Sequence, residues 1–239
     1  MTDELFTTDA YLRSVKATVA EMYDQGVVLD KTIFYAQSGG QPGDTGWLRW
    51  KGGEVRVADT FRQDGQIVHQ VEGSAPPEGT KIKAELDWAR RHLLMRTHTA
   101  LHALSGIVFR DYGAKVTGGS MDPGIARMDF ELATMSQEFG LIVEEKLNTE
   151  LEKDRPVTVS FLPRARAVAD LDLIRTKVNL IPANVDPIRV IDIEGLDKQA
   201  DGGTHVRSTA EVGRVRVTKT ESKGKGFKRM RIELVDDEE

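Results

Sequence analysis

Three of the five histidines in this 239-residue chain fall into two short segments that together could bind a metal ion. His98 and His102 are four residues apart, so on a helix their imidazoles lie on one face. His205 follows a Gly-Gly pair, which frees the backbone to bring a side chain in from a loop, and Asp201 stands four residues before it. Three convergent histidines beside a carboxylate could hold zinc, and a catalytic zinc typically has three protein ligands and a water.

The residue pattern alone leaves two interpretations of these histidines open. A single histidine is more often a hydrogen-bonded structural residue than a metal ligand, and pairs four residues apart arise frequently by chance. The segment from His98 to His102 reads His-Thr-Ala-Leu-His and lacks the glutamate that serves as general base in His-Glu-x-x-His proteases. Metalloprotease chemistry is therefore disfavoured, while a zinc site and structural histidines both remain.

The first histidine pair falls in a predicted helix over residues 87–112. Apolar residues recur there at about 100° per residue and form one stripe, made of Leu94, Leu101, Leu104 and Val108. On this count the two histidines lie at the edge of the stripe, where a side chain can face a cleft while the helix stays packed. A second helix is predicted over residues 136–153, with Ser136 as N-cap and Pro156 as stop.

Short strand-like runs before the first helix predict a small β-barrel. Gly, Asp and Gln-Pro-Gly turn residues separate these runs, which cover residues 26–30, 47–50, 54–57, 66–69 and 81–86. Later strands are predicted at 157–161 and 188–193, and a hairpin over 214–234 turns at 222–226. We therefore predict an α+β fold in two domains. A barrel covers residues 1–88, and an α/β domain with helices and an antiparallel sheet covers residues 89–239.

Composition indicates an ordinary globular protein. Hydrophobic residues make up 39% and charged residues 30% of the chain. No apolar stretch approaches the roughly 18–20 residues of a membrane helix, and the acidic N-terminus lacks the apolar core of a signal peptide, so we expect a cytoplasmic location without membrane contact. The absence of cysteine excludes disulfides and thiolate ligands. The net charge of −5 gives no general attraction to nucleic acid, so such binding needs a local basic surface.

Three segments of the sequence resemble one known family. Arg96–Leu104 is similar to the first zinc motif in the editing domain of alanyl-tRNA synthetases and, more closely, in the free-standing AlaX proteins. Asp201–Val206 resembles the second motif, and Phe34–Gly46 resembles the family's glycine-rich segment. The matches occur in the family's order and span nearly the whole chain, as in the medium-length AlaX-M class. No segment resembles the ATP-binding catalytic domain of a full synthetase.

The resemblance implies a zinc-dependent deacylase that acts in trans on tRNA-Ala mischarged with serine or glycine. It makes His98, His102 and His205 ligands of one zinc ion. Where the family commonly has cysteine this chain has Asp201, a harder ligand whose oxygen can bind zinc at about 2.0–2.2 Å. Asp201 either binds the metal directly, orients a metal-bound water, or leaves the fourth position open. The metal itself either activates water for attack on the ester or anchors the substrate.

Discrimination between serine and alanine depends on one hydroxyl group. A pocket for alanine cannot strongly reject an analogue that only adds a hydroxyl, so a separate hydrolytic site is useful. A site that hydrogen-bonds the serine hydroxyl leaves a buried polar group unpaired when alanine enters. The resemblance assigns this recognition to Thr117, whose alternative role is that of a turn residue. It also assigns substrate binding to the glycine-rich segment, with Gly39, Gly40, Gln41 and Asp44, where the residues alone indicate a tight turn.

Basic residues cluster in the predicted hairpin. Between residues 214 and 231, eight lysines and arginines stand against a single acid, Glu221. If the hairpin forms, four arginines share its polar face and suit the phosphates of tRNA: Arg214, Arg216, Arg229 and Arg231. The alternative is a solvated face that protects an edge strand.

Two other functions stay open beside the editing hydrolase. The change from cysteine to Asp201 could mark a catalytically inactive relative that binds tRNA or an amino acid without hydrolysis, although three retained histidines argue against it. An unrelated metallohydrolase would be favoured only if the protein ignored aminoacyl-tRNA. The sequence indicates no protein partner and does not decide between monomer and dimer.

Overall fold

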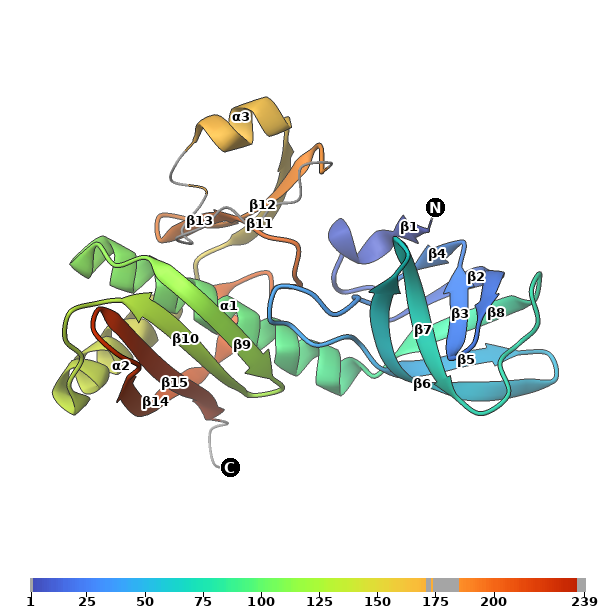
Figure 1. Ribbon diagram of the computed structural model, residues 1–239, viewed down its shortest axis with the longest axis horizontal. Helices are drawn as coiled ribbons and strands as arrows, with labels where there is room; N and C mark the ends of the chain where they lie inside the picture. Colours follow the sequence, from blue (N-terminus) through green and yellow to red (C-terminus); the bar gives the residue numbers. More distant parts are fainter. Residues whose placement is uncertain (1, 171–172, 174–184, 236–239) are drawn as a thin grey trace. The chain divides into compact units, whose positions relative to one another are not determined.

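The computed structural model describes residues 2–170, 173 and 185–235, and it confirms the predicted α+β class (Figure 1). The chain forms two compact units, Met1–Leu93 and Leu94–Glu239. Helix α1 (Trp88–Tyr112) contributes to both units. The assignment of separate roles to residues 1–88 and 89–239 stays a prediction. Among the described residues, no helix is long and apolar enough to cross a membrane.

The first unit is a closed antiparallel barrel whose strand order is β2-β3-β7-β6-β5-β8. Its strands are β2 (Ser14–Tyr23), β3 (Gly26–Leu29), β5 (Gly46–Trp50), β6 (Gly53–Gln63), β7 (Gln66–Glu72) and β8 (Lys81–Leu86). A short parallel pair, β1 (Asp3–Glu4) and β4 (Lys31–Thr32), adjoins the barrel with the 3₁₀ turn η1 (Leu5–Thr7). Inward-facing residues fill the core, among them Val19, Leu29, Leu48, Val57 and Ile82.

Strand β2 was not predicted from the sequence. Its inward residues do alternate, because Ala17 and Val19 are buried while Lys16 is exposed. The intervening Lys, Ala, Glu and Met residues are good helix formers, which obscures the alternation. Pairing of β2 with both β3 and β8 closes the barrel.

Within its described residues, the second unit forms two antiparallel sheets, and three helical segments beyond α1 have defined bounds. One sheet has the order β14-β15-β10-β9, with β9 (Val116–Asp122), β10 (Ile125–Glu131), β14 (Arg214–Ser222) and β15 (Phe227–Val235). The other has the order β11-β12-β13, with β11 (Val157–Leu162), β12 (Ile188–Ile193) and β13 (Asp197–Ala200). The helical segments are α2 (Gln137–Leu151), α3 (Arg164–Ala169) and the 3₁₀ turn η3 (Thr209–Val212).

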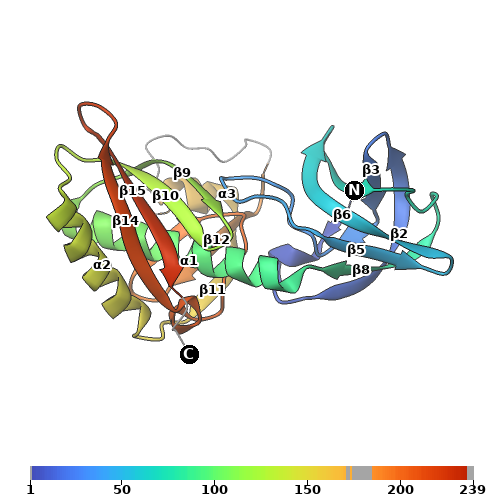
Figure 2. The ribbon, with the colours of Figure 1, turned by 90° about the horizontal axis from the view of Figure 1, so that it is seen from below.

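One face of the four-stranded sheet is apolar, and α2 packs alongside β14 (Figure 2). Cross-strand pairs place Met128 opposite Met230 and Ala126 opposite Ile232, and all four are buried. The hairpin of β14 and β15 forms as predicted, with its turn between residues 222 and 227. The β9–β10 hairpin was not predicted, because its glycines and its Pro-Gly turn favour loop over strand.

Both long helices lie close to their predicted bounds. Ser136 caps α2 by accepting a hydrogen bond from the Phe139 N–H at 3.0 Å. That helix ends at Leu151, before Pro156. Helix α1 is more enclosed than its stripe of leucines predicts, because residues on its other sides are also fully buried. His98 and His102 are consequently 6% and 7% exposed, and they lie in the interior rather than at an open edge.

Candidate metal centre

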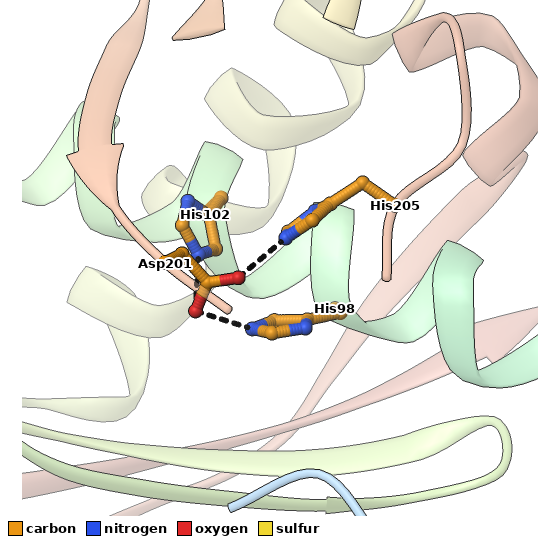
Figure 3. Close-up of side chains that lie close together, drawn as sticks. All are labelled: His98, His102, Asp201 and His205. Carbon is orange, nitrogen blue, oxygen red and sulfur yellow. Dashed lines mark hydrogen bonds and ion pairs between the residues drawn. The ribbon is translucent and has the colours of Figure 1, made fainter. Parts of the chain in front are cut away.

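The structure brings His98, His102, Asp201 and His205 together inside the second unit (Figure 3). The histidines at 98 and 102 project from successive turns of α1, while Asp201 directly follows β13 and His205 lies in the segment that leads to η3. One ligand atom from each residue lies within 4.8 Å of all the others. Residues a hundred positions apart in the sequence therefore offer four donors to one point, as the two short segments predict.

The carboxylate of Asp201 stands at the centre of this group. Its Oδ2 lies 3.1 Å from the Nε2 of His205, and its Oδ1 lies 3.7 Å and 3.9 Å from the Nε2 atoms of His98 and His102. All three imidazoles thus direct the same ring nitrogen at the carboxylate. The Gly203 N–H donates to the Asp201 Oδ2 at 2.6 Å, which fixes the carboxylate on its own loop.

Burial sets the protonation states of the group. It lowers the pKa of His98 to about 4 and, together with the charge of His98, holds the pKa of His205 well below its usual value. Burial would also lower the pKa of His102, but its hydrogen bond to Asp197 and the charge of Asp201 raise it. Burial alone would raise the pKa of Asp201, yet the neighbouring histidines hold it well below its usual range. The carboxylate of Asp201 and the neutral imidazoles of His98 and His205 are the forms that bind metal ions, whereas a proton on His102 competes with the metal.

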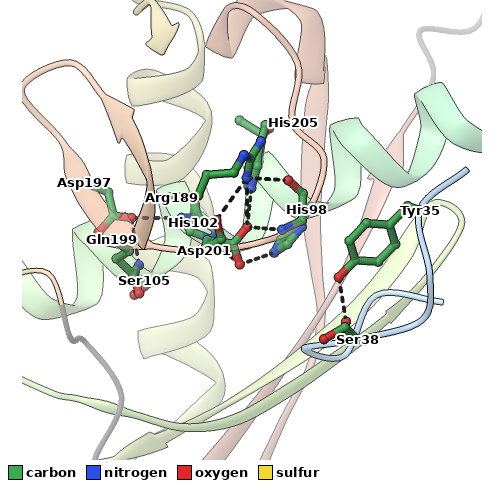
Figure 4. Close-up of polar contacts among 12 residues, drawn as sticks. Tyr35, Ser38, His98, His102, Ser105, Arg189, Asp197, Gln199, Asp201 and His205 are labelled. Carbon is green, nitrogen blue, oxygen red and sulfur yellow. Dashed lines mark hydrogen bonds and ion pairs between the residues drawn. The ribbon is translucent and has the colours of Figure 1, made fainter. Parts of the chain in front are cut away.

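Polar partners around the group fix the orientation of two imidazoles (Figure 4). The Nδ1 of His102 lies 3.1 Å from the Oδ2 of Asp197, which also accepts a hydrogen bond from Gln199 at 2.7 Å. The Nδ1 of His205 lies 3.1 Å from the hydroxyl of Thr99. The contact with Asp197 favours the Nδ1–H tautomer of His102, because a carboxylate only accepts, and it leaves the Nε2 lone pair of that ring for a metal ion. The Thr99 hydroxyl can donate or accept, so it fixes the orientation of the His205 ring.

A glycine in α1 makes the contact between Asp197 and His102 possible. Gly106 stands one helical turn after His102, and a Cβ built on it would lie 2.8 Å from the Leu196 carbonyl oxygen and 3.0 Å from the Asp197 Cβ. The start of β13 therefore reaches the helix only because residue 106 has no side chain. This close approach carries the Asp197 carboxylate to the imidazole.

Arg189 of β12 organises the loop that carries Asp201. Its guanidinium donates to the carbonyl oxygens of Asp201 at 3.0 Å and of Gly203 at 2.8 Å. Its NH1 also lies 3.9 Å from the Asp201 Oδ2, so a buried cation stands beside the carboxylate.

The residues Asp197, Arg189 and Thr99 were not predicted as parts of the site. Of these, Thr99 had a signal in the sequence, because it lies within the His-Thr-Ala-Leu-His segment.

Thr117 lies in strand β9, which contradicts its alternative role as a turn residue. The pairing of β9 with β10 is irregular at this point, since Val116 pairs with Phe130 and Gly118 with Asp129. Irregularities of this kind re-aim a side chain relative to the regular strand. Thr117 is half-buried, and its role in substrate recognition stays a prediction.

The glycine-rich segment of the first unit contains the tight turn that the residues indicate. Ser38 and Gln41 exchange two backbone hydrogen bonds, and Gly39 and Gly40 between them have φ angles of 57° and 86°. Positive φ at both central residues defines a type I′ turn and explains the glycines. The binding of substrate by Gly39, Gly40 and Gln41 stays a prediction.

Asp44, the acid of the same segment, is buried in an ion pair with Arg91. The Arg91 Nε lies 2.9 Å and 3.0 Å from the two carboxylate oxygens, and the Tyr35 N–H donates to the Oδ2 at 2.6 Å. Asp44 is 1% exposed. These bonds give Asp44 a structural role within the first unit. Its predicted contact with substrate stays a prediction.

The four hairpin arginines share one face of β14 and β15, opposite Val215 and Met230. Three of them are held by carboxylates: Arg229 by Asp129 at 2.7 Å, Arg231 by Glu221 at 2.9 Å and Arg216 by Glu233 at 3.2 Å. Asp129 comes from the neighbouring strand β10, outside the window counted in the sequence. The net positive charge of this face is therefore smaller than the number of basic residues between 214 and 231 indicates. Among the described residues, Arg214 has no ion pair.

Comparison with known proteins identifies the class of protein first. The chain matches the family of class II (A) tRNA synthetases over residues 7–90. Residues 188–231 match the second additional domain of threonyl and alanyl tRNA synthetases. The chain is also 41% identical over 230 residues to an alanine–tRNA ligase of Pyrobaculum calidifontis, of which it spans 25%. It is thus built from synthetase-related parts.

Full-length relatives then specify the family. The chain is 34% identical over 243 residues to the alanyl-tRNA editing protein AlaX-M of Methanosarcina barkeri, with 99% of this chain and 100% of the relative covered. It is 36% identical over 236 residues to the AlaX-M protein of Saccharolobus solfataricus, with 96% and 98% covered. The chain belongs to the AlaX-M family of alanyl-tRNA editing proteins.

Proposed function

We propose that this protein is a zinc-dependent hydrolase that removes serine, and also glycine, from mischarged tRNA-Ala in the cytoplasm. The observation that carries the proposal is the buried group of His98, His102, Asp201 and His205 in a chain of the AlaX-M family. The net reaction adds water across the ester between the amino acid and the terminal ribose of the tRNA. Its products are the free amino acid and a tRNA that can be charged again.

The donor set suits zinc. Three imidazole nitrogens and one carboxylate oxygen are common zinc ligands, and tetrahedral ligands at about 2.0–2.1 Å from zinc lie about 3.3 Å apart. The separations of 3.1, 3.7 and 3.9 Å around Asp201 are close to that value. We assign His98, His102 and His205 as ligands through Nε2 and Asp201 as the fourth donor through its carboxylate. When bound, zinc supplies a Lewis acid that polarises the ester or activates water.

The chain's own residues orient the ligands and recognise the substrate. Asp197 accepts the Nδ1–H of His102, which keeps the Nε2 lone pair of that ring directed at the site, and Thr99 orients the His205 ring through its Nδ1. Thr117 hydrogen-bonds the hydroxyl of the serine moiety, and alanine leaves that bond unmade. The four hairpin arginines contact tRNA phosphates, with Arg214 the most available because the other three are ion-paired.

Deacylation of Ser-tRNA-Ala beside Ala-tRNA-Ala tests the proposal. We expect rapid loss of serine, little loss of alanine, and inhibition by a zinc chelator that added zinc reverses. The variant His98→Ala should lose both zinc and activity. As a matched control, His92→Ala removes a histidine of the same helix that is not in the metal group, and it should keep both. A folded, zinc-loaded protein that hydrolyses neither ester would refute the editing function.

A further inference from the structure

The outer face of the barrel carries a groove in which four of the eight lining residues are lysines. The groove has a volume of about 340 Å³ and lies where β2, β4 and β8 meet. Its charged lining consists of Lys16, Lys31, Lys81, Lys83 and, as the one acid among the described lining residues, Asp30. Strands β2 and β8 are neighbours in the barrel (Figure 1), and their lysines at 16, 81 and 83 line the same groove.

The strand register places like charges next to one another. Lys16 of β2 stands directly opposite Lys83 of β8, and Lys83 stands opposite Arg49 of β5 on its other side. Like charges directly opposite on a sheet are destabilising. Glu85 relieves part of this repulsion, because it contacts Lys83 at 2.5 Å and also pairs with Arg49. Glu54 of β6 stands opposite Arg49 and pairs with it at 2.8 Å, so among the described residues Lys16 is the cation of this row that has no ion pair.

Three of the lysines are free to meet an external anion. In the part of the chain that the structure describes, Lys16, Lys31 and Lys81 form no ion pair. The one lining acid, Asp30, is already engaged, since its Oδ1 accepts the backbone N–H groups of Thr18 at 2.8 Å and Lys31 at 2.9 Å. In a protein with a net charge of −5, this concentration of unpaired cations is a local exception.

The geometry favours a long polyanion over a small discrete anion. Small phosphates are typically held by converging backbone N–H groups at helix ends or nests. Here the groove is walled by β2 and β8, whose backbones pair with each other and with neighbouring strands. Residues two apart on a strand are spaced about 6.6 Å and neighbouring strands about 4.8 Å, so the lysines form a grid of point charges. Such a grid follows a phosphate backbone without reading its sequence.

We propose that this lysine groove binds the phosphodiester backbone of RNA. The proposal rests on the proposed function, which makes a tRNA the substrate, and it extends that function to a second contact surface on the barrel. The groove adds affinity that does not depend on sequence and takes no part in the hydrolysis. Lysine suits this task because its ammonium group is a mobile point charge.

Salt-dependent binding of uncharged tRNA-Ala, measured by fluorescence anisotropy, tests the groove. The double variant Lys16→Gln/Lys81→Gln removes two unpaired cations. Because each phosphate contact contributes about 0.9 to the slope of log affinity against log salt, we expect a slope shallower by about 1.8. The affinity near 50 mM salt should fall by roughly tenfold or more. Thermal unfolding of each variant checks that the barrel is intact.

The control is Lys51→Gln/Arg56→Gln, which removes two exposed cations of the first unit that do not line the groove. Among the described residues Lys51 forms no ion pair, and Arg56 lies 3.9 Å from Glu72. We expect the control to keep the wild-type slope. Equal losses in the two double variants, or an unchanged slope in the lysine variant, would overturn the proposal. Equally tight, lysine-dependent binding of poly-glutamate or phosphatidylserine vesicles would overturn the assignment to RNA.

The two proposals fail separately. Uncharged tRNA cannot be deacylated, so its binding does not depend on the hydrolytic site. If the wild type binds it through the lysines but releases no serine from Ser-tRNA-Ala, the groove stands and the editing function falls. If serine is released and the lysine variant binds tRNA as the wild type does, the editing function stands and the groove falls.

Discussion

Replacing Asp197 by asparagine tests how the partner of His102 supports the metal site. The substitution keeps the shape of the side chain and removes its negative charge. The carboxylate is fully buried, lies 3.1 Å from the His102 Nδ1 and is itself bound by Gln199. Its hydrogen bond to the imidazole makes the opposite ring nitrogen more basic, so the variant should bind zinc more weakly.

The expected loss of zinc affinity follows from the role of Asp197, which supports the ligand His102 but is not itself a ligand. Loss of such a partner typically weakens metal binding by about 10–100-fold, or about 1.4–2.7 kcal/mol. The buried, charge-assisted bond places Asp197 in the upper part of that range. The pH adds a sign. Asp197 raises the pKa of His102, and a proton there competes with the metal below that pKa. The difference between wild type and variant should therefore be largest at alkaline pH and narrow as the pH falls.

A zinc-competition titration with a fluorescent chelator gives this affinity directly. It should be made at about pH 8.5, roughly two units above the usual histidine pKa, and repeated near neutral pH. Asp192→Asn is the control, because that partly exposed carboxylate on β12 pairs with Lys198 at 3.1 Å and is not one of the metal group. We expect it to bind zinc as the wild type does. A folded Asp197→Asn protein with wild-type zinc affinity at alkaline pH would refute the positioning role.

Three further substitutions separate recognition, metal binding and folding. Thr117→Val should lower serine release by more than about tenfold with zinc content unchanged, and an unaltered ratio of Ser-tRNA to Ala-tRNA hydrolysis would rule out its role. Asp201→Ala should lower zinc content measured by elemental analysis, whereas full occupancy with lost activity would show that the carboxylate is not a ligand. Arg91→Met leaves Asp44 buried without its cation and should lower the free energy of unfolding by about 3–5 kcal/mol. Chemical denaturation measures that loss, and an unchanged midpoint would contradict the structural role of the pair.

Periodicity predicted the elements in which one pattern dominates. The helix that carries His98 and His102 and the capped helix beginning after Ser136 lie within a few residues of their predicted bounds. The β9–β10 hairpin was missed because glycines at 118 and 119 weaken strand propensity, and pairing with β15 is what stabilises it. Local propensity cannot register a neighbour that lies a hundred residues further along the chain.

At the candidate site, too, some residues could be predicted from the sequence and others could not. The spacing of the histidines and the Gly-Gly loop drew attention to the four residues that the structure groups together. Asp197 carried no signal, because its proximity to His102 depends on the close packing of β13 against Gly106. The partial neutralisation of the hairpin by Asp129 was equally hidden, since β10 contributes that acid from across the sheet. Residue types and spacing indicate which chemistry is available, whereas the surrounding contacts arise only in the folded chain.

Zinc titration of the chelator-stripped protein tests the central claim most directly. Serine release from Ser-tRNA-Ala is measured as zinc is added in substoichiometric steps. The account predicts that activity is absent at the start, rises in proportion to added zinc and reaches its plateau at one ion per chain. Full activity in the stripped protein would contradict this claim. So would a His205→Ala variant whose activity reaches the same plateau at one zinc ion per chain.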